Sequence, residues 1–155
     1  MKHLWAPWRL KYIKHAGQTG CIFCEKSKGR KDEKNLVLTR GKTCFAILNL
    51  FPYNSGHFMV APYRHTGQLE HLVPKEIEEM FEMVNRFKRK LLRKVKPQGF
   101  NIGFNLGRVA GAGIVNHIHI HVVPRWNGDT NFMPVLAETK VLPQSLKETY
   151  QMLTD

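Results

Sequence analysis

The sequence predicts an antiparallel α+β domain, and three observations support this prediction. Short apolar segments compatible with strands are separated by turn-rich connections of hairpin length. One long segment, residues 74–96, repeats apolar residues at helical spacing. Histidines alternate strictly with aliphatic residues in the segment 116–123, as on a strand with two different faces. We therefore expect an antiparallel sheet of about five strands with one long and one short helix.

The length and composition indicate one compact domain. The 155 residues fit a single domain, and 43% of them are hydrophobic, which is enough to build a core. This composition excludes a disordered chain and a chain held mainly by disulfides. We divide the domain into an N-terminal segment with a cysteine pair (1–35), a core (36–135) and a C-terminal helix or tail (136–155).

The chain is strongly basic. Lys and Arg number 24 against 12 Asp and Glu, which gives a formal net charge of +12. Such a field attracts nucleic acid, anionic lipid or nucleotide polyphosphates, although it also fits a simply basic surface. Many of the charges crowd the end of the predicted long helix, where a solvated face is the commoner explanation. Nucleic-acid binding therefore stays open.

The cysteines and apolar runs bear on the cellular compartment. Cys21 and Cys24 form a C-x-x-C and Cys44 lies alone, an odd count that argues against a secreted disulfide framework. The N-terminus has no continuous apolar stretch of signal-peptide length. No run approaches the roughly 18 apolar residues that a membrane span requires. We expect a cytoplasmic protein that does not enter a membrane.

The first half of the chain predicts three strands. Residues 1–35 are expected to be irregular, with a polar loop from Ser27 to Lys34. Apolar segments then predict strands at 36–39, 44–50 and 57–61, the last ended by Pro62. The segment FPYNSG at 51–56 predicts a turn, since Pro, Asn, Ser and Gly favour turns.

The second half predicts the long helix, a hairpin and a short helix. The helix at 74–96 has one apolar face, formed by Ile77, Met80, Phe81, Val84, Phe87, Leu91, Leu92 and Val95. Glutamates near its start and basic residues near its end match the helix dipole. Strands are expected at 100–106 and 116–123, joined by a glycine-rich turn. Pro143 opens the short C-terminal helix.

The segment from Asn116 to Arg125, NHIHIHVVPR, carries the clearest chemical signal. In a strand, His117, His119 and His121 share one face, and the intervening aliphatic residues share the other. The aliphatic face belongs in the core, so the imidazole face lines a pocket or a metal site. Three interpretations remain open from the residues alone: an incidental surface strand, the ligands of a zinc hydrolase, or histidine chemistry on phosphate.

Residues 117–123 fit the motif His-φ-His-φ-His-φ-φ, with φ apolar, at every position, and so resemble the histidine triad (HIT) family of nucleotide hydrolases and transferases. The continuation Pro124-Arg125-Trp126 is similar to the bacterial branch related to diadenosine tetraphosphate phosphorylases. Further similarity lies in WAPWR (5–9), LNLFPYNSGH (48–57), FNIGFNLG (100–107) and RWNGD (125–129). The resemblance covers most of the chain and implies a single HIT domain with the HIT-like fold over residues 1–155.

The resemblance implies a covalent mechanism with His119 as the nucleophile. His119 would attack the α-phosphorus of a nucleotide, and water or inorganic phosphate would release a nucleoside monophosphate or diphosphate. A neutral imidazole suits this role because a hydrogen bond to its second nitrogen can fix the tautomer. His121 would contact the phosphate or assist the leaving group. His57 would lie beside the phosphates, although a histidine that starts a strand can also be simply exposed.

The resemblance also implies substrate contacts. Asn49 would contact the ribose and Asn105 the α-phosphate. The glycine-rich turn around Gly111 would let backbone N–H groups approach phosphate oxygens, although any hairpin can use such a turn. Trp126 would stack on a base or serve only in packing. Residues 112–115 depart from the family, because many members carry Ser, Thr or Gln there, near the leaving group.

Cys21 and Cys24 have the spacing of half a zinc site, although C-x-x-C alone also fits a redox pair or chance. Zinc-carrying members of the family use two further ligands, a histidine matching His65 and the first triad histidine, His117. The resemblance therefore implies a closed Cys2His2 zinc site of the structural type.

Several functions follow as hypotheses. The first is an enzyme that hydrolyses or transfers nucleotidyl groups of dinucleoside polyphosphates, with adenine nucleotides as substrates. The alternatives are an adenylate or phosphoramidate hydrolase, a nucleotide or nucleic-acid binding module with vestigial catalysis, and a zinc-dependent hydrolase. The resemblance further implies a homodimer in which helices and sheet edges pair between subunits.

Overall fold

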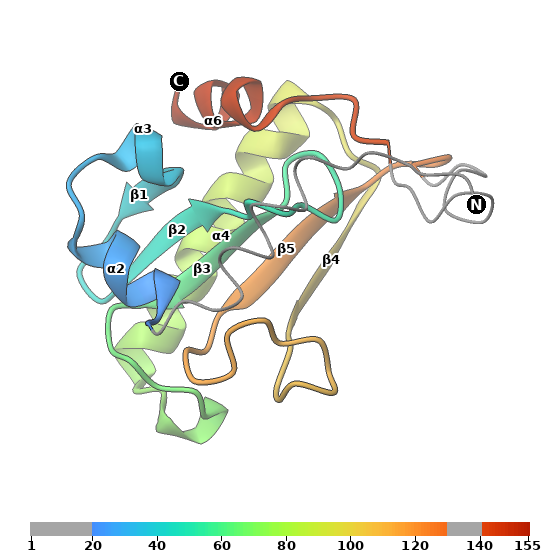
Figure 1. The fold of residues 1–155 in the computed structure, drawn as a ribbon. Helices are drawn as coiled ribbons and strands as arrows, with labels where there is room; N and C mark the ends of the chain where they lie inside the picture. Colours follow the sequence, from blue (N-terminus) through green and yellow to red (C-terminus); the bar gives the residue numbers. More distant parts are fainter. Residues whose placement is uncertain (1–19, 130–140) are drawn as a thin grey trace, which may run out of the picture.

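A computed structural model describes residues 20–129 and 141–155, and it confirms the α+β prediction (Figure 1). One antiparallel five-stranded sheet has the order β1-β2-β3-β5-β4. Its strands are β1 (Val37–Arg40), β2 (Cys44–Leu48), β3 (Phe58–Pro62), β4 (Gly99–Phe104) and β5 (Ile120–Arg125). The helices of the described residues are α2 (Ile22–Lys28), α3 (Asp32–Asn35), the 3-10 turn η1 (Leu69–His71), α4 (Pro74–Lys94) and α6 (Leu146–Thr154). Within those residues, no helix is both long and apolar enough to cross a membrane.

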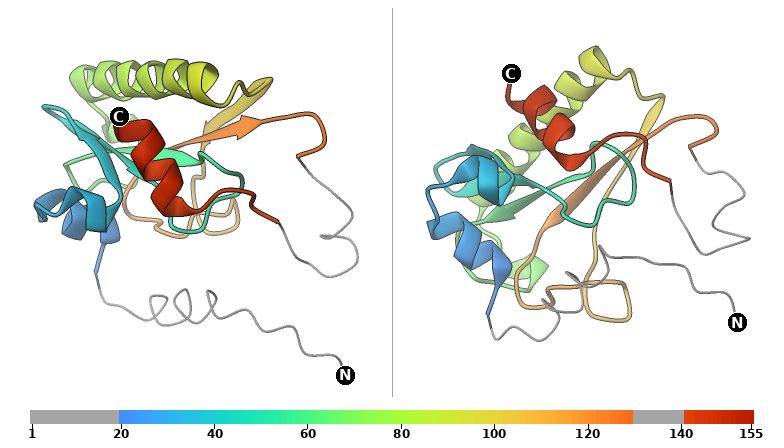
Figure 2. Two further views of the ribbon diagram at one scale, coloured as in Figure 1. Left: turned by 90° about the horizontal axis from the view of Figure 1, so that it is seen from above. Right: turned by 45° about the horizontal axis from the view of Figure 1, so that its top comes forward.

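The two faces of the sheet are covered by different helices, with α4 on one side and α2 on the other (Figure 2). Strand β2 is buried throughout and alternates between the two sides. Ala46 and Leu48 pack into the cluster that contains α4, whereas Phe45 and Ile47 pack into the cluster that contains Phe23 of α2. Because both faces are covered, the central strands read as continuous apolar runs.

Helix α4 confirms the predicted long helix, but its apolar residues do not form a single buried face. The side chains of Met80, Met83, Val84, Phe87 and Leu91 are buried against the sheet. Three others on the predicted face are exposed: Ile77 at 41%, Phe81 at 47% and Leu92 at 42%. The apolar residues therefore form two stripes, of which only one belongs to the core.

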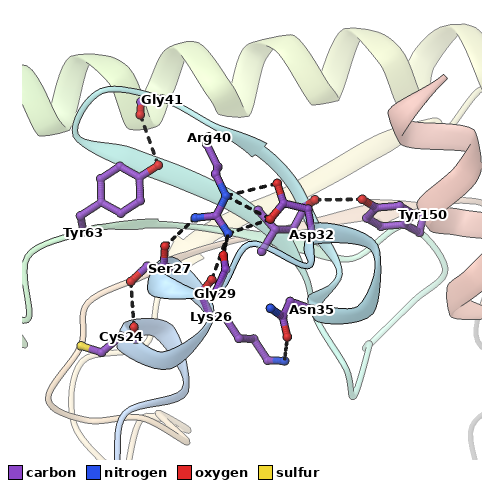
Figure 3. Close-up of polar contacts among 11 residues, drawn as sticks. Cys24, Lys26, Ser27, Gly29, Asp32, Asn35, Arg40, Gly41, Tyr63 and Tyr150 are labelled. Atoms are coloured by element: carbon purple, nitrogen blue, oxygen red, sulfur yellow. Dashed lines mark hydrogen bonds and ion pairs between the residues drawn. The ribbon is translucent and has the colours of Figure 1, made fainter.

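The predicted loop from Ser27 to Lys34 is wrong, because α2 and α3 occupy most of it (Figure 3). The cause is a tertiary contact. Arg40 of β1 donates from its guanidinium to the carbonyl oxygens of Lys26, Ser27 and Gly29, at 3.1, 2.6 and 2.5 Å. It also pairs with Asp32 of α3 at 2.7 Å. The last carbonyls of a helix have no partners within the helix, and Arg40 supplies donors to those at the end of α2.

Strand β5 begins at Ile120, four residues later than the predicted start at Asn116. Pro62 ends the partner strand β3. The N–H of Tyr63 donates to Thr43 on the β2 side, so the nitrogen of Pro62 faces β5 and has no proton to donate. Instead, Nε2 of His117 donates a hydrogen bond to the Pro62 carbonyl, at 2.8 Å. The other strand limits lie within two residues of the predictions.

The predicted alternation survives this shift. Ile118, Ile120 and Val122 all lie in the core cluster under α4. His119 and Phe23 pack ring to ring on the opposite side, where α2 lies. The short C-terminal helix is also confirmed, as α6, although it begins after Ser145 and not at Pro143.

Candidate active site and metal site

His119 lies directly before β5 in one fixed orientation. Its Nδ1 is 2.8 Å from the carbonyl oxygen of His117, and a carbonyl oxygen only accepts, so Nδ1–H donates. In the neutral ring the lone pair then lies on Nε2, which has no hydrogen-bond partner within residues 20–129 and 141–155. Burial lowers the pKa of His119, while the bond to His117 acts in the opposite direction. A neutral imidazole with a free Nε2 is a nucleophile.

His57 and His121 form a second, directional pair. The backbone N–H of Tyr53 donates to Nδ1 of His57 at 3.0 Å, so the proton of the neutral His57 ring is on Nε2. That Nε2 lies 2.9 Å from Nδ1 of His121 and donates to it. Neutral His121 consequently carries its own proton on Nε2. This series of hydrogen bonds turns His121 into a donor at Nε2.

Burial keeps both rings of this pair neutral. It lowers the pKa of His57 to about 3, and repulsion from His121 and His119 adds to the effect. Burial likewise lowers the pKa of His121 to about 4, with repulsion from His119 as the second cause. His119 and His121 lie side by side, their ring centroids 4.8 Å apart. The ring that offers a lone pair, His119, thus lies beside the ring that donates a proton, His121.

The two predicted substrate-binding asparagines adjoin this pair. The Nδ2 atom of Asn49 is 3.3 Å from Nδ1 of His57. The Nδ2 atom of Asn105 is 3.5 Å from Nε2 of His121 and from the carbonyl oxygen of Gly111. Gly111 has a φ of +94°, which favours glycine and lets the loop lie against Asn105. The structure therefore brings Asn49, Asn105 and Gly111 together with the histidines.

Trp126 is not part of this cluster. It follows β5 at the end opposite to His121, and its indole N–H donates to the carbonyl oxygen of Val95 beyond α4, at 3.1 Å. Its ring lines a surface groove with Asn54, Val95 and Met152. Packing explains this placement within one chain, and base stacking by Trp126 stays a prediction.

A second cluster brings together Cys21, Cys24, His65 and His117, the four predicted zinc ligands. Their ligand atoms all lie within 4.8 Å of one another. The sulfur of Cys21 is 3.2 Å from Nδ1 of His117, and the sulfur of Cys24 is 3.3 Å from Nδ1 of His65. Tetrahedral zinc with bonds of 2.0–2.3 Å sets its ligand atoms about 3.3–3.8 Å apart. The residues therefore fit such an ion.

The surroundings of this cluster favour a cation. Nε2 of His117 donates to the Pro62 carbonyl at 2.8 Å, which leaves Nδ1 as the ligand atom facing the sulfurs. Burial raises the pKa of the Cys21 thiol, so a bound cation would be needed to stabilise its thiolate. His117 also joins the two sites, because its ring belongs to this cluster while its carbonyl accepts from His119.

Two residues that the sequence did not single out belong to the site. Phe23 packs against the rings of His117 and His119, at centroid distances of 5.1 and 4.7 Å. Tyr53 stacks on His121 at 5.8 Å and 20°, and its backbone N–H fixes the His57 tautomer. The signal for Phe23 was its place inside the C-x-x-C, and the signal for Tyr53 was its turn next to His57.

The fold and the paired histidine sites are those of a histidine triad protein, and comparison with known families agrees. Residues 30–128 match the family model described as the HIT domain, so this chain belongs to the HIT family. The zinc-bound histidine triad family protein from Mycobacterium smegmatis has a similar structure, with a TM-score of 0.68 and 28% identity. The similarity covers 89% of this chain and 93% of that one.

Similar sequences include nucleotide phosphorylases and hydrolases. A Mycobacterium tuberculosis protein named AP-4-A phosphorylase is 39% identical over 161 residues, which cover 99% of this chain and 83% of that protein. A Schizosaccharomyces pombe protein named bis(5'-nucleosyl)-tetraphosphatase (asymmetrical) is 33% identical over 93 residues, which cover 60% of this chain and 50% of that protein. These relatives identify the chain as an enzyme of the nucleotide phosphorylase and hydrolase type.

Proposed function

We propose that this enzyme cleaves dinucleoside polyphosphates of the diadenosine tetraphosphate type through a nucleotidyl-His119 intermediate. The observation that carries the proposal is the complementary pair of tautomers, a lone pair on Nε2 of His119 beside a proton on Nε2 of His121. The relatives named AP-4-A phosphorylase and bis(5'-nucleosyl)-tetraphosphatase support this class of substrate.

The proposed reaction has two balanced halves. In the first, Nε2 of His119 bonds to the α-phosphorus as the bond from that phosphorus to the bridging oxygen breaks. His121 gives its Nε2 proton to the departing oxygen. In the second, an oxygen of water or inorganic phosphate bonds to that phosphorus as its bond to Nε2 of His119 breaks, and the attacking oxygen gives its proton to His121. Asn49, Asn105 and the Gly111 loop would hold the ribose and phosphates, since they adjoin this histidine pair.

A product assay with diadenosine tetraphosphate tests this proposal. With inorganic phosphate we expect ADP and ATP; with water alone, AMP and ATP. His119→Ala should abolish both reactions, because no other ring would offer a free Nε2 at this place. His71→Ala is the matched control, since His71 is an exposed histidine of η1. Unchanged turnover in His119→Ala would rule out the covalent mechanism.

We also propose that the Cys21, Cys24, His65 and His117 cluster binds one structural zinc ion. A closed set of four protein ligands leaves no position for substrate, and among the described residues this cluster includes only one of the three triad histidines. When bound, the ion would tie the N-terminal segment to the segment that precedes β5. The geometry therefore gives no support to the hypothesis of a zinc-dependent hydrolase that uses the whole triad as ligands.

The zinc content of the purified protein checks this assignment. We expect about one zinc ion per chain, and Cys21→Ser should remove it and lower the melting temperature. Cys44→Ser is the control, because Cys44 is buried in the core cluster under α4 and does not belong to the ligand cluster. A metal-free wild-type protein with the same melting temperature as Cys21→Ser would overturn the zinc site.

We further propose that the chain forms a homodimer through β4 and α4. Among the described residues, strand β4 lies at the edge of the sheet, and Ile102 on it is 43% exposed. The exposed stripe of α4, formed by Ile77, Phe81 and Leu92, adds apolar surface. An unpaired edge strand with exposed apolar residues favours pairing with a second copy.

A further inference from the structure

We propose that Phe23 is a positioning residue that makes the orientation of His119 depend on the metal cluster. The proposal rests on the proposed function for the role of His119 as the nucleophile and for the zinc ion in the cluster. His117 already links the two sites, because its ring belongs to the metal cluster and its carbonyl accepts from His119. The proposal concerns a second connection, which runs through one side chain of α2.

Phe23 lies between the two cysteines in sequence and between the two sites in space. Cys24 follows it directly and Cys21 lies two residues before it, and both belong to the proposed zinc site. Its side chain is 1% exposed, and its ring lies 5.1 Å from the ring of His117 and 4.7 Å from that of His119. On the far side it meets Phe45 at 6.3 Å. Phe23 therefore forms the wall against which the nucleophilic ring rests.

Helix α2 is held at both ends, so the ring of Phe23 follows the helix. At the N-terminal end, the sulfurs of Cys21 and Cys24 belong to the four-ligand cluster. At the C-terminal end, Arg40 binds the carbonyl oxygens of Lys26, Ser27 and Gly29. The helix has only seven residues and would not be stable by itself. Loss of the attachment at the N-terminal end would therefore make the segment that carries Phe23 more mobile.

Besides the ring of His121, His119 contacts the His117 carbonyl and the Phe23 ring, and these two contacts have different effects. Its hydrogen bond to the His117 carbonyl fixes the direction of the Nδ1–Nε2 axis but permits the ring to rock about that bond. The Phe23 ring, tilted by 37° to that of His119, limits this rocking. A displacement of the reacting nitrogen by about 1 Å can lower a rate by up to about 100-fold. A smaller side chain at position 23 should therefore slow the chemical step more than it weakens substrate binding.

The experiment compares Phe23→Leu with Phe87→Leu in the full-length, zinc-loaded protein. Phe87 is a matched control, because it is 2% exposed, is also a core phenylalanine, and packs on Phe58 under α4. Zinc content, kcat and KM for diadenosine tetraphosphate, and the ring signals of His119 in 1H–13C NMR spectra are measured. The spectra are repeated on wild-type protein after zinc removal by a chelator.

We expect Phe23→Leu to keep its zinc, to lose roughly tenfold in kcat with little change in KM, and to broaden the His119 signals. Zinc removal from the wild type should broaden the same signals, and Phe87→Leu should leave them sharp. The proposal is overturned if Phe23→Leu matches Phe87→Leu in kcat and spectra, or if zinc removal leaves His119 unchanged. Should the wild type fail to cleave the substrate, the proposed function fails, while the spectra still test the connection.

Discussion

At the scale of single residues, the site depends on histidines that stay neutral. The pKa of His57 is about 3 and that of His121 about 4, both below the ordinary value near 6.5, because burial disfavours the charged ring. Neutrality is what makes the hydrogen bonds from Tyr53 through His57 to His121 directional. Protonation of either ring would end this order. The same shifts also make stability depend on pH.

The pH dependence of stability follows from these two values. Between about pH 4 and 6.5, unfolded histidines bind protons that His57 and His121 in the folded protein do not, so stability falls as the pH falls through this window. Each such histidine contributes a slope of at most about 1.4 kcal/mol per pH unit. Urea unfolding at pH 7 and pH 5 measures it. His57→Gln should show the smaller loss, and equal losses in the variant and the wild type would contradict the shifted pKa of His57.

At the scale of elements, the strands and α4 were predictable because their signals are local. Apolar runs and a helical repeat lie within each segment, so the sheet, α4 and α6 followed from the sequence. Helix α2 did not, because the cap on its last carbonyls comes from Arg40, more than ten residues away on β1. The late start of β5 could not be predicted for a similar reason, since it depends on Pro62 in another strand.

Arg40 should accordingly contribute more to the free energy of unfolding than an ordinary surface arginine does. Arg40→Leu leaves the carbonyls of Lys26 and Ser27 in α2, that of Gly29 after it, and Asp32 without their partner. Hydrogen bonds to a charged group contribute about 1.5–3 kcal/mol each when buried, and partial exposure reduces this, so we expect a loss of about 2 kcal/mol. Urea unfolding compares it with Arg93→Leu, at an exposed position of α4. Equal stability of the two variants would show that α2 does not depend on this cap.

The residues of the candidate site were predictable from the sequence, but the hydrogen bonds that fix their tautomers were not. The triad, His57, the asparagines and the four predicted zinc ligands came from sequence motifs and the family resemblance, and the structure brings them together in two adjoining clusters. The tautomers were not predictable, because they depend on a backbone N–H at Tyr53 and a backbone carbonyl at His117. Backbone groups are present in every residue, so no residue type signals them.

At the scale of the whole molecule, the exposed apolar residues of β4 and α4 predict that two copies of the chain associate. Sedimentation equilibrium should give twice the 18.0 kDa mass of one chain. Ile102→Lys should shift the protein to the monomer, because it places a charge at the proposed edge contact. Leu69→Lys is the control, since Leu69 in η1 is also 43% exposed. A monomeric wild type would contradict the dimer.

The net charge of +12 acts on the whole molecule as well. Exposed basic residues at the end of α4, among them Arg89, Arg93 and Lys94, would raise the local concentration of polyphosphates. The same charge would attract nucleic acid, and that binding, like the cytoplasmic location, stays a prediction.

The donor that orders the His57–His121 pair is a main-chain amide, that of Tyr53. Evolution can therefore exchange the side chain at this position while the direction of proton donation is inherited unchanged. Proline alone, which has no amide proton, would remove it. The direction of proton donation is thus independent of the side chain at residue 53, while the phenolic ring there affects the pair only through its packing on His57 and His121.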